Sequence, residues 1–381
     1  MDLLYKIFID PFVQMGAAPD LLIQTLWEGL VGGVLYALIA LGFVLIFKAS
    51  GVFNFAQGIM VVFAALTLVG LTNSGVPRGV SVLVILAGLA LAGWWLYRFL
   101  AARSARTPGS AADHQWRWLV GIGIALFGVA AFFLFEQRMP AFIALAVTIG
   151  VMFVLAVAVE RLVLRPLVNQ PDIILFMATF GLTYFLIGLG ELIFGGEPKV
   201  MVTDELFLPR GNYEWRVFGG FVSFQKLDIA AAVIASILVA TLAIFFQRTR
   251  IGRALRAVAD SHKAALSVGI SLEQIWVIVW FAAGIVALAT GIMWGARSDV
   301  SFALQIIAFK ALPVLILGGF TSIPGAIVGG IIIGVGEKLG EFYWGPLLGS
   351  GIESWLAYMI ALFFLLFRPQ GLFGERIIER I

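Results

Sequence analysis

Few residues in this sequence have side chains that could do chemistry, and the first group interrupts an apolar run. The segment Asn54-Phe55-Ala56-Gln57-Gly58 divides the apolar residues between positions 29 and 72. If it lies within a bilayer, its amide side chains and freed backbone N–H groups must face protein or a water-filled cavity. Backbone N–H groups at the start of a helix favour a carboxylate, so Asn54, Gln57 and Gly58 are candidates to line a solute path. The alternative is a plain cytoplasmic turn between two spans, capped by Asn54, and both interpretations stay open.

Lys310 is the second candidate, because it is the one charged residue in the apolar stretch 302–319. A charge at membrane depth costs about 2.5–3.5 kcal/mol even on insertion scales. Lys310 therefore lines the solute path, snorkels along a short helix, or pairs with a carboxylate such as Glu337, and the sequence favours the structural ion pair. Glu337 and the other acidic residues near the expected outer ends of spans are expected to be solvated. These others are Glu191, Glu341 and Glu353.

The third group is a basic, amphipathic segment at 248–274. Ile251, Leu255 and Val258 recur at helical spacing, and Arg253 and Arg256 lie between them. A short second amphipathic turn ends at Gly269, a residue that commonly terminates a helix. Such a helix lies on the membrane or docks in the groove of a partner. The alternative is a basic juxtamembrane loop with no partner.

Several chemistries are excluded by absent residues. The chain has no Cys and only 2 His, which excludes disulfides, thiol catalysis and a His-rich metal site. It lacks a G-x-x-x-x-G-K-[ST] loop, an H-E-x-x-H pair and a nucleophile elbow. We therefore expect no catalytic residue, no metal and no cofactor bound by this chain, and no nucleic-acid partner.

The elements that must hold these residues are membrane helices. The chain is 381 residues long, 61% hydrophobic and only 12% charged, which leaves too few charges to cover a water-facing surface. The expected fold is all-α, a polytopic transmembrane helical bundle of about 9–11 segments, each needing roughly 20 apolar residues. Two shorter pieces, 303–318 and 325–340, are either two short spans or a broken, re-entrant pair. The expected full spans are 21–47, 55–72, 80–100, 117–136, 140–164, 173–195, 228–247, 275–295 and 352–367.

The distribution of Lys and Arg predicts the orientation. When the 248–274 loop is cytoplasmic and the spans alternate, the inner loops hold most of the Lys and Arg residues. The C-terminus is then cytoplasmic, and the 196–227 stretch is an ordered extracytoplasmic loop. Residues 1–20 are expected to form an amphipathic segment at the membrane interface, and 21–381 a single transmembrane domain.

Five motifs, in order along the chain, resemble those of branched-chain amino acid ABC importer permeases. The N-F-A-Q-G run at 54–58 points to the LivH type, and Lys263, Ala264, Ala265 and Gly269 have the spacing of the E-A-A-x-x-x-G loop that engages the ATPases. The remaining motifs are Glu160-Arg161 with Arg165-Pro166-Leu167, Leu317-Gly318-Gly319 through Ser322-Ile323-Pro324-Gly325-Ala326, and Arg368-Pro369-Gln370-Gly371-Leu372-Phe373-Gly374.

This resemblance implies a multi-pass permease subunit of the bacterial inner membrane, surrounded by membrane lipid. Its implied partners are a second permease of the LivM type, two cytoplasmic ATP-binding subunits that use the ATP, and an extracytoplasmic substrate-binding protein. The resemblance also implies that the 251–270 segment, with Arg253 and Arg256, transmits ATPase closure to the spans. The implied substrates are branched-chain or related amino acids. The alternatives are urea, amides or small organic acids carried by the same type of importer, or a self-sufficient secondary transporter or channel.

The sequence departs from the family pattern in three places. Gln57 stands where the family usually has His, and Lys263 stands where the loop motif usually has Glu. Residues 76–139 look like an insertion, with two apolar segments joined by a linker at 101–116. The insertion is either a lipid-facing addition or an extra surface for a partner.

Overall fold

The fold is known from a computed structural model, which describes residues 2–74, 138–167, 170–201, 203–204, 206–260, 262–349 and 351–374. The predicted spans 80–100 and 117–136 and the linker 101–116 lie outside the described residues, as does nearly all of the predicted insertion.

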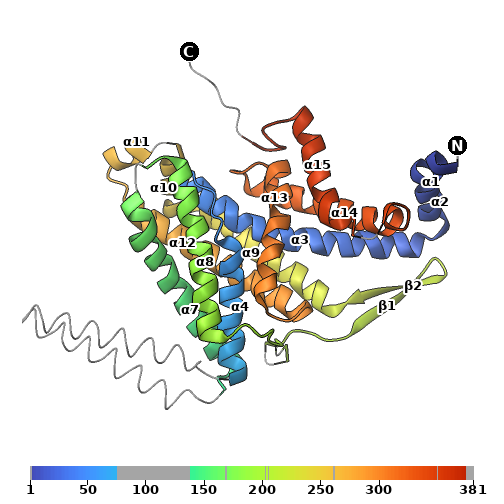
Figure 1. Ribbon diagram of the computed structural model, residues 1–381, viewed down its shortest axis with the longest axis horizontal. Helices are drawn as coiled ribbons and strands as arrows, with labels where there is room; N and C mark the ends of the chain where they lie inside the picture. Colours follow the sequence, from blue (N-terminus) through green and yellow to red (C-terminus); the bar gives the residue numbers. More distant parts are fainter. Residues whose placement is uncertain are drawn as a thin grey trace, which may run out of the picture.

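The described part of the chain is almost entirely helical (Figure 1). The helices are α1 (Asp2–Phe8), α2 (Asp10–Ala17), α3 (Pro19–Ser50), α4 (Gln57–Ser74), α7 (Ala141–Ala158), α8 (Asp172–Phe194), α9 (Lys226–Arg248), α10 (Arg250–Asp260), α11 (His262–Ser267), α12 (Leu272–Arg297), α13 (Ile307–Gly318), α14 (Ile323–Leu348) and α15 (Glu353–Phe367). Three short turns of other helix types are η1 (Val159–Leu164), η2 (Arg165–Leu167) and η3 (Phe302–Ile306). Two strands, β1 (Asn212–Val217) and β2 (Gly220–Gln225), form an antiparallel hairpin.

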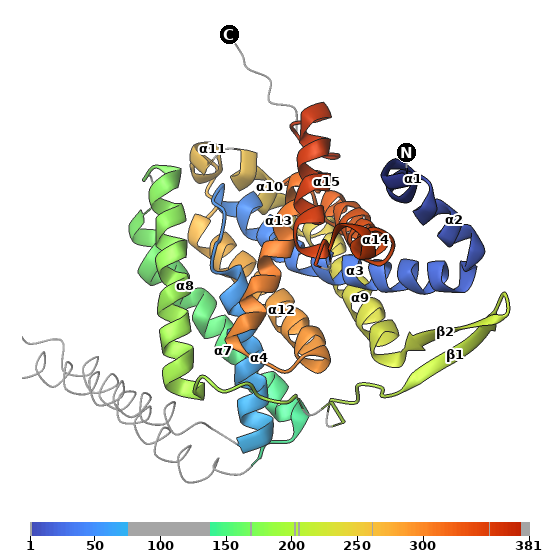
Figure 2. The same cartoon turned by 45° about the vertical axis from the view of Figure 1, so that its right-hand side comes forward.

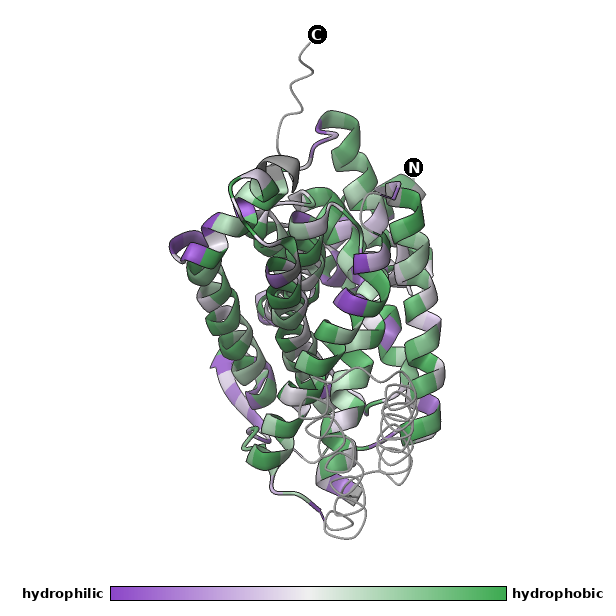
Figure 3. Ribbon diagram, turned by 90° about the vertical axis from the view of Figure 1, so that its left-hand side faces the viewer, coloured by the Kyte–Doolittle hydropathy of each residue, from purple (hydrophilic) through white to green (hydrophobic). Residues whose placement is uncertain are grey.

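The predicted polytopic helical bundle is confirmed. Among the described residues, 6 helices are long and apolar enough to cross a membrane, and shorter apolar helices cover 57–73, 302–318 and 353–367. Most residues of the described helices are hydrophobic (Figure 3), and many large hydrophobic side chains are exposed, as expected for helices that contact lipid or another membrane subunit.

The long helix α3 is the centre of the bundle, and its tightest neighbour is α14. Small residues permit this approach, because a Cβ on Gly29 would lie 2.7 Å from the Cα of Val335, and one on Gly33 would lie 2.9 Å from the Cα of Ile331. The glycine spacing at 330 and 334 therefore serves close helix packing against α3.

The 303–340 region forms two separate helices. The short helix α13 ends at Gly318, the chain turns at 319–322, and α14 returns alongside it at nearly full span length. A Cβ on Gly329 would lie 2.7 Å from the carbonyl oxygen of Val314, so this glycine lets α13 and α14 pack closely. The region is thus a short apolar helix followed by one long enough to cross a membrane, and whether the short helix is a span or a re-entrant segment stays a prediction.

The two ends of the bundle carry different elements. One end, here called the α10 end, brings together the last turns of α3 and α9, helix α10 and the first turn of α12. The other, the hairpin end, carries β1 and β2, the start of α9 and the end of α12, where Arg297 pairs with Asp228 (Figure 2). The predicted extracytoplasmic loop is therefore partly a β-hairpin.

The N-terminal segment is helical and lies at the hairpin end. The indole N–H of Trp344 in α14 donates to the carbonyl of Ile7 at 2.9 Å, and the Trp344 ring meets Phe12 edge-on. Leu4, Phe8 and Phe12 are exposed. An interfacial position for residues 1–20 stays a prediction.

Candidate functional site

The segment between α3 and α4 folds back into the bundle. Helix α3 ends at Gly51, whose positive φ of 72° turns the chain, and α4 begins only six residues later at Gln57. The side chains of Asn54 and Gln57 are both 0% exposed. The segment is therefore enclosed by protein rather than open to the cytoplasm as a plain surface turn.

The two amides are held by protein groups. The Asn54 Oδ1 accepts a hydrogen bond from the backbone N–H of Ala56 at 3.0 Å, and the Gln57 Nε2 donates to the carbonyl of Ala283 in α12 at 3.4 Å. Gly42 of α3 leaves the space that Gln57 fills, since a Cβ there would lie 2.8 Å from the Gln57 Cδ. Asn54 and Gln57 thus stabilise the fold-back, and neither side chain is among the lining residues of the adjacent cavity between α4, α8 and α13.

An aromatic cavity of about 150 Å³ lies beside this segment. A Cβ on Gly58 would lie 2.8 Å from the Cβ of Ala308, so the glycine lets α13 approach the first turn of α4. The ring of Phe53 stacks on that of Phe43 with centroids 4.8 Å apart. The lining residues are Phe43, Phe53, Phe55, Gly58, Ile59, Thr183, Tyr184, Ile187, Gln305, Ala308, Phe309 and Leu312.

The cavity opens on an exposed apolar face formed by α8 and α13. Tyr184 and Phe309, which line the cavity, are exposed, as is the neighbouring Phe180. A continuous exposed apolar face on a membrane protein contacts lipid or the apolar face of another membrane subunit.

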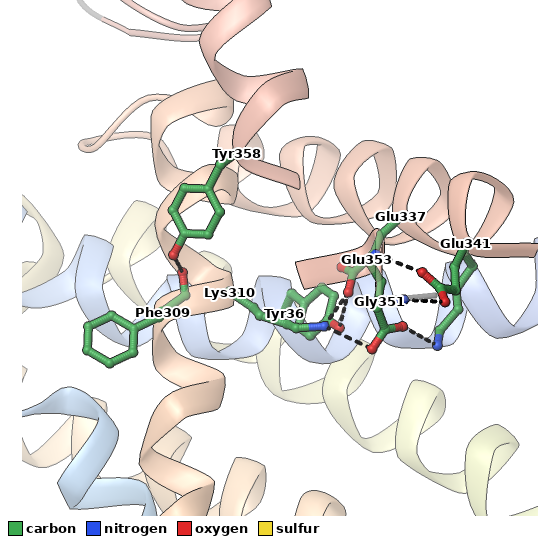
Figure 4. A network of polar contacts seen from close by, with 9 residues as sticks. Tyr36, Phe309, Lys310, Glu337, Glu341, Gly351, Glu353 and Tyr358 are labelled. Carbon is green, nitrogen blue, oxygen red and sulfur yellow. Dashed lines mark hydrogen bonds and ion pairs between the residues drawn. The ribbon is translucent and has the colours of Figure 1, made fainter. Parts of the chain in front are cut away.

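Lys310 lies on the opposite side of α13, in a network that joins four helices (Figure 4). Its Nζ pairs with the Oε1 of Glu337, which also accepts a hydrogen bond from the Tyr36 hydroxyl at 3.3 Å. A second carboxylate, Glu353 of α15, lies 3.5 Å from Lys310 and 2.9 Å from Lys338. The predicted ion pair between Lys310 and Glu337 is confirmed.

Three of the four acidic residues expected to be solvated at outer ends have protein partners instead, Glu353 through its ion pair with Lys338. Glu337 is 0% exposed, so the expectation of solvation is wrong for this residue, because its carboxylate completes the Lys310 pair inside the bundle. Glu341 accepts the backbone N–H groups of Gly351 and Glu353, each at 2.9 Å, and so fixes the turn between α14 and α15. Glu191 is exposed, as expected.

Helix α10 packs onto the bundle with the apolar stripe that the sequence predicted. Leu255 and Val258 are buried, while Arg253 is exposed. The Thr249 hydroxyl caps the helix by accepting the N–H of Gly252 at 3.1 Å. Because the stripe is covered by this chain, a partner that docks here must contact the exposed face.

The two candidate arginines of α10 have different surroundings. The guanidinium of Arg256 donates to the carbonyls of Phe246 at 2.7 Å and Gln247 at 3.4 Å, which are the last carbonyls of α9. These carbonyls have no partner within their own helix, so Arg256 ties α10 to the end of α9. Arg253 is left as the arginine that points its charge to solvent or a partner.

Helix α11 ends as the sequence predicted. Gly269 has a φ of 83°, and the N–H groups of Gly269 and Ile270 donate to the carbonyls of Leu266 and Ala265, both at 3.0 Å. This pattern is a Schellman cap, which requires a left-handed residue at its centre. Ala265 is buried; the side chains of Lys263 and Ala264 lie outside the described residues.

Sequence reasoning missed several residues of these sites. The aromatic wall at 43, 53 and 55 carried no signal, because Phe is abundant throughout the chain, with 33 residues. Leu266 and Val268 are exposed apolar residues beside the α11 cap, and only their position within a basic loop could have marked them. The hydrogen bond from Arg256 to the Phe246 carbonyl was also missed, because its acceptor lies ten residues away at the end of α9.

The fold and the site define a multi-pass helical membrane protein with a permease-like body and a basic helix at one end. A family described as the permease component of the branched-chain amino acid transport system matches residues 25–108 and 120–368. The chain belongs to this family.

Named relatives cover nearly the whole chain. It is 27% identical over 369 residues to the high-affinity branched-chain amino acid transport system permease protein BraD of Pseudomonas aeruginosa, covering 94% of this chain and 98% of the relative. It is 24% identical to the corresponding protein LivH of Escherichia coli, covering 94% and 97%. A fructose import permease protein, FruG of Bifidobacterium longum, is 22% identical over 65% of this chain and 72% of its own. No solved structure matches the chain.

Proposed function

We propose that this chain is one of two permease subunits in an ABC importer of branched-chain or related amino acids, in the bacterial inner membrane. Its partners are a second permease, two cytoplasmic ATP-binding subunits and an extracytoplasmic substrate-binding protein. ATP is bound and hydrolysed by the partner subunits, and this chain itself binds no cofactor. Membership of the family, and relatives named for branched-chain amino acid transport, support this proposal.

The observation that carries the substrate class is the aromatic cavity beside the 54–58 segment. Its walls are mainly aromatic rings and aliphatic side chains, and its polar groups come from Thr183, Tyr184 and Gln305. Burying an aliphatic side chain against such walls is favourable by about 0.8 kcal/mol for each CH₂ group. An uncharged polar solute such as urea has no aliphatic side chain and gains no comparable free energy of binding in this cavity.

The second permease completes the path. The cavity opens on the exposed face of α8 and α13, and the apolar surface around Tyr184 and Phe309 suits a membrane partner better than water. A substrate that passes between the two subunits then moves along this face, next to the fold-back segment. Asn54 and Gln57 act by positioning this segment, and Gly58 acts by leaving room for α13.

Coupling to ATP runs through α10 and α11. The α10 end is cytoplasmic in the orientation that the Lys and Arg residues favour. Arg256 and the buried stripe fix α10 to α9, so a push on α10 moves the spans, while Arg253, Leu266 and Val268 face outward for contact with an ATPase. The spans have two conformations, which differ in the contacts that this surface makes with the open and with the closed ATPase dimer.

The proposal is tested by uptake into proteoliposomes that contain this chain with the second permease, ATPases and binding protein encoded beside it. We expect ATP-dependent uptake of radiolabelled leucine, isoleucine or valine, and no uptake of urea. Substituting Phe55→Ala, which removes one cavity wall, lowers kcat/KM for leucine at least tenfold. The matched control is Phe363→Ala, an exposed ring on α15 that lines no described cavity.

Two outcomes overturn the proposal. Uptake of urea or an organic acid in place of leucine assigns the same importer type to another substrate. Uptake by this chain alone, driven by an ion gradient and indifferent to ATP, identifies a self-sufficient secondary transporter.

A further inference from the structure

A second and larger cavity lies at the hairpin end, on the other side of α13 from the aromatic cavity. It has a volume of about 680 Å³ and is called the chamber below. Its walls come from the first half of α3, the base of the hairpin, the start of α9, the end of α12, two residues of α13 and one residue each of α14 and α15. In the orientation that the Lys and Arg residues favour, the chamber faces the extracytoplasmic side, where a binding protein releases its cargo.

The chamber wall carries charges of both signs. Asp228 and Arg297 form one pair at 2.9 Å, and the Asp228 side chain is only 5% exposed, so this pair is closed. Lys310 pairs with Glu337, which lies behind the wall and is not a lining residue. The pair between Lys338 and Glu353, at 2.9 Å, is more open, with 36% and 32% of the two side chains exposed.

An aromatic surface adjoins these charges. The rings of Tyr36 and Trp294 stack with centroids 6.0 Å apart, and the Lys310 Nζ lies 5.6 Å from the Tyr36 centroid. Both rings line the chamber. The chamber therefore offers a partly exposed cation, a partly exposed anion and an aromatic wall within one half-open volume, although Tyr36 itself is only 4% exposed.

We propose that the chamber binds an α-amino acid in its zwitterionic form, with the carboxylate on Lys338 and the ammonium on Glu353. The aliphatic side chain of the ligand then packs on the half-buried ring of Trp294, which stacks on the buried ring of Tyr36. This inference rests on the proposed function, because the substrate class is the one proposed above. It adds a site on this chain that recognises the charged groups of the substrate, whereas the aromatic cavity recognises the side chain.

A zwitterion fits this wall for a reason of charge balance. When it enters, each member of the Lys338–Glu353 pair exchanges its partner for the opposite charge of the ligand, so no charge is left unpaired. An amine that takes Glu353 deprives Lys338 of its carboxylate, and a carboxylic acid that takes Lys338 leaves Glu353 with only the longer contact to Lys310, at 3.5 Å. Either loss in a partly desolvated cavity is unfavourable. The chamber therefore discriminates against amines and carboxylic acids that carry the same side chain.

The test measures direct binding to the purified complex of both permeases and the ATPases, without the binding protein. Saturation-transfer NMR with L-leucine reports weak binding, and 3-methylbutylamine and 4-methylpentanoate are probes that each lack one charge. We expect a leucine signal that 4-methylpentanoate and 3-methylbutylamine do not displace. Lys338→Gln and Glu353→Gln each weaken leucine binding at least tenfold, and the matched control Lys199→Gln, at a lysine outside the chamber lining, leaves it unchanged.

A structural role for the pair is separated by the charge-swapped double variant, Lys338→Glu with Glu353→Lys. This variant restores the ion pair between positions 338 and 353 but places its new lysine beside Lys310, which lies 3.5 Å from Glu353 in the unaltered chain, so the yield of the complex recovers in part. It also reverses the charges relative to Tyr36 and Trp294, so leucine binding stays weak. Unchanged binding by the two single variants, or full recovery by the charge swap, overturns the chamber site. If the unaltered importer takes up leucine but these variants bind leucine normally, only the proposal of a chamber site is wrong. If the unaltered importer takes up no leucine, the proposed function is wrong as well.

Discussion

Phe309 and Lys310 follow one another along α13, and their side chains line two different cavities. Phe309 lines the aromatic cavity between α4, α8 and α13, and Lys310 lines the charged chamber at the hairpin end. Helix α13 is therefore the wall between the two cavities. A shift or rotation of this one helix therefore changes both cavities at once.

The Lys310–Glu337 pair fixes α13 to α14, and its loss is expected to be costly. Lys310→Met leaves a carboxylate buried without a cation, and removing one member of a buried pair costs about 3–5 kcal/mol. We expect a lower melting temperature and lower yield of the purified complex. The double variant Lys310→Met with Glu337→Gln recovers most of the loss, because neither charge is then buried alone.

Comparing the single and double variants isolates the interaction. The melting temperature of the purified complex, measured by intrinsic fluorescence, gives the interaction between the two substitutions by the double-mutant cycle. Additive effects of the two substitutions would contradict a direct ion pair.

The packing of α3 on α14 predicts different effects at two adjacent glycines. A Cβ on Gly33 would lie 2.9 Å from the backbone of Ile331, whereas one on Gly32 meets no atom within 4 Å. We expect Gly33→Ala to destabilise the bundle by about 1–3 kcal/mol through overpacking, and Gly32→Ala to leave its stability nearly unchanged. Thermal unfolding of the two purified variants checks the difference, and equal melting temperatures would refute the close contact.

Much of this fold could be predicted from the sequence because membrane spans have a local signal. Runs of about 20 apolar residues mark spans, and the described helices fall on the predicted positions, including the pair at 303–340. The Gly269 helix end was predictable because a left-handed cap is a local backbone property. The Lys310–Glu337 pair was predictable because a lysine at membrane depth requires a counter-charge and few are near.

The rest of the site depends on contacts between distant segments. The burial of Gln57 depends on Gly42 in α3 and Ala283 in α12, and nothing local to residue 57 distinguishes this from a surface turn. The aromatic cavity combines residues from α3, α4, α8 and α13 with the segment at 53–55. Hydropathy locates the spans that carry most of these residues, but it does not show which spans pack against one another.

The different surroundings of Arg256 and Arg253 predict different defects. Arg256→Gln removes charge-assisted hydrogen bonds to the end of α9, which contribute about 1.5–3 kcal/mol. We expect backbone hydrogen exchange across 250–260 to accelerate about tenfold or more and uptake to fall. Arg253→Gln leaves exchange unchanged and weakens ATPase recovery with the purified permease. If both variants accelerate exchange equally, Arg256 has no special role in anchoring α10.

The cap at Gly269 predicts a graded series at one position. A side chain at a φ of 83° is strained, by about 1–2 kcal/mol for most residues and less for Asn, which tolerates the left-handed region. Gly269→Ala should therefore loosen the turn more than Gly269→Asn. The loosened turn breaks the hydrogen bond from the Ile270 N–H to the Ala265 carbonyl, so hydrogen exchange at 265–272 rises in the same order.

The same series predicts an effect on transport, because this turn joins the exposed Leu266 and Val268 to α12. We expect ATP-driven leucine uptake to fall in the same order as exchange rises. The control Gly150→Ala, in an open position on α7, leaves exchange and uptake unchanged. Faster exchange with normal uptake would show that the cap is structural and lies outside the coupling route.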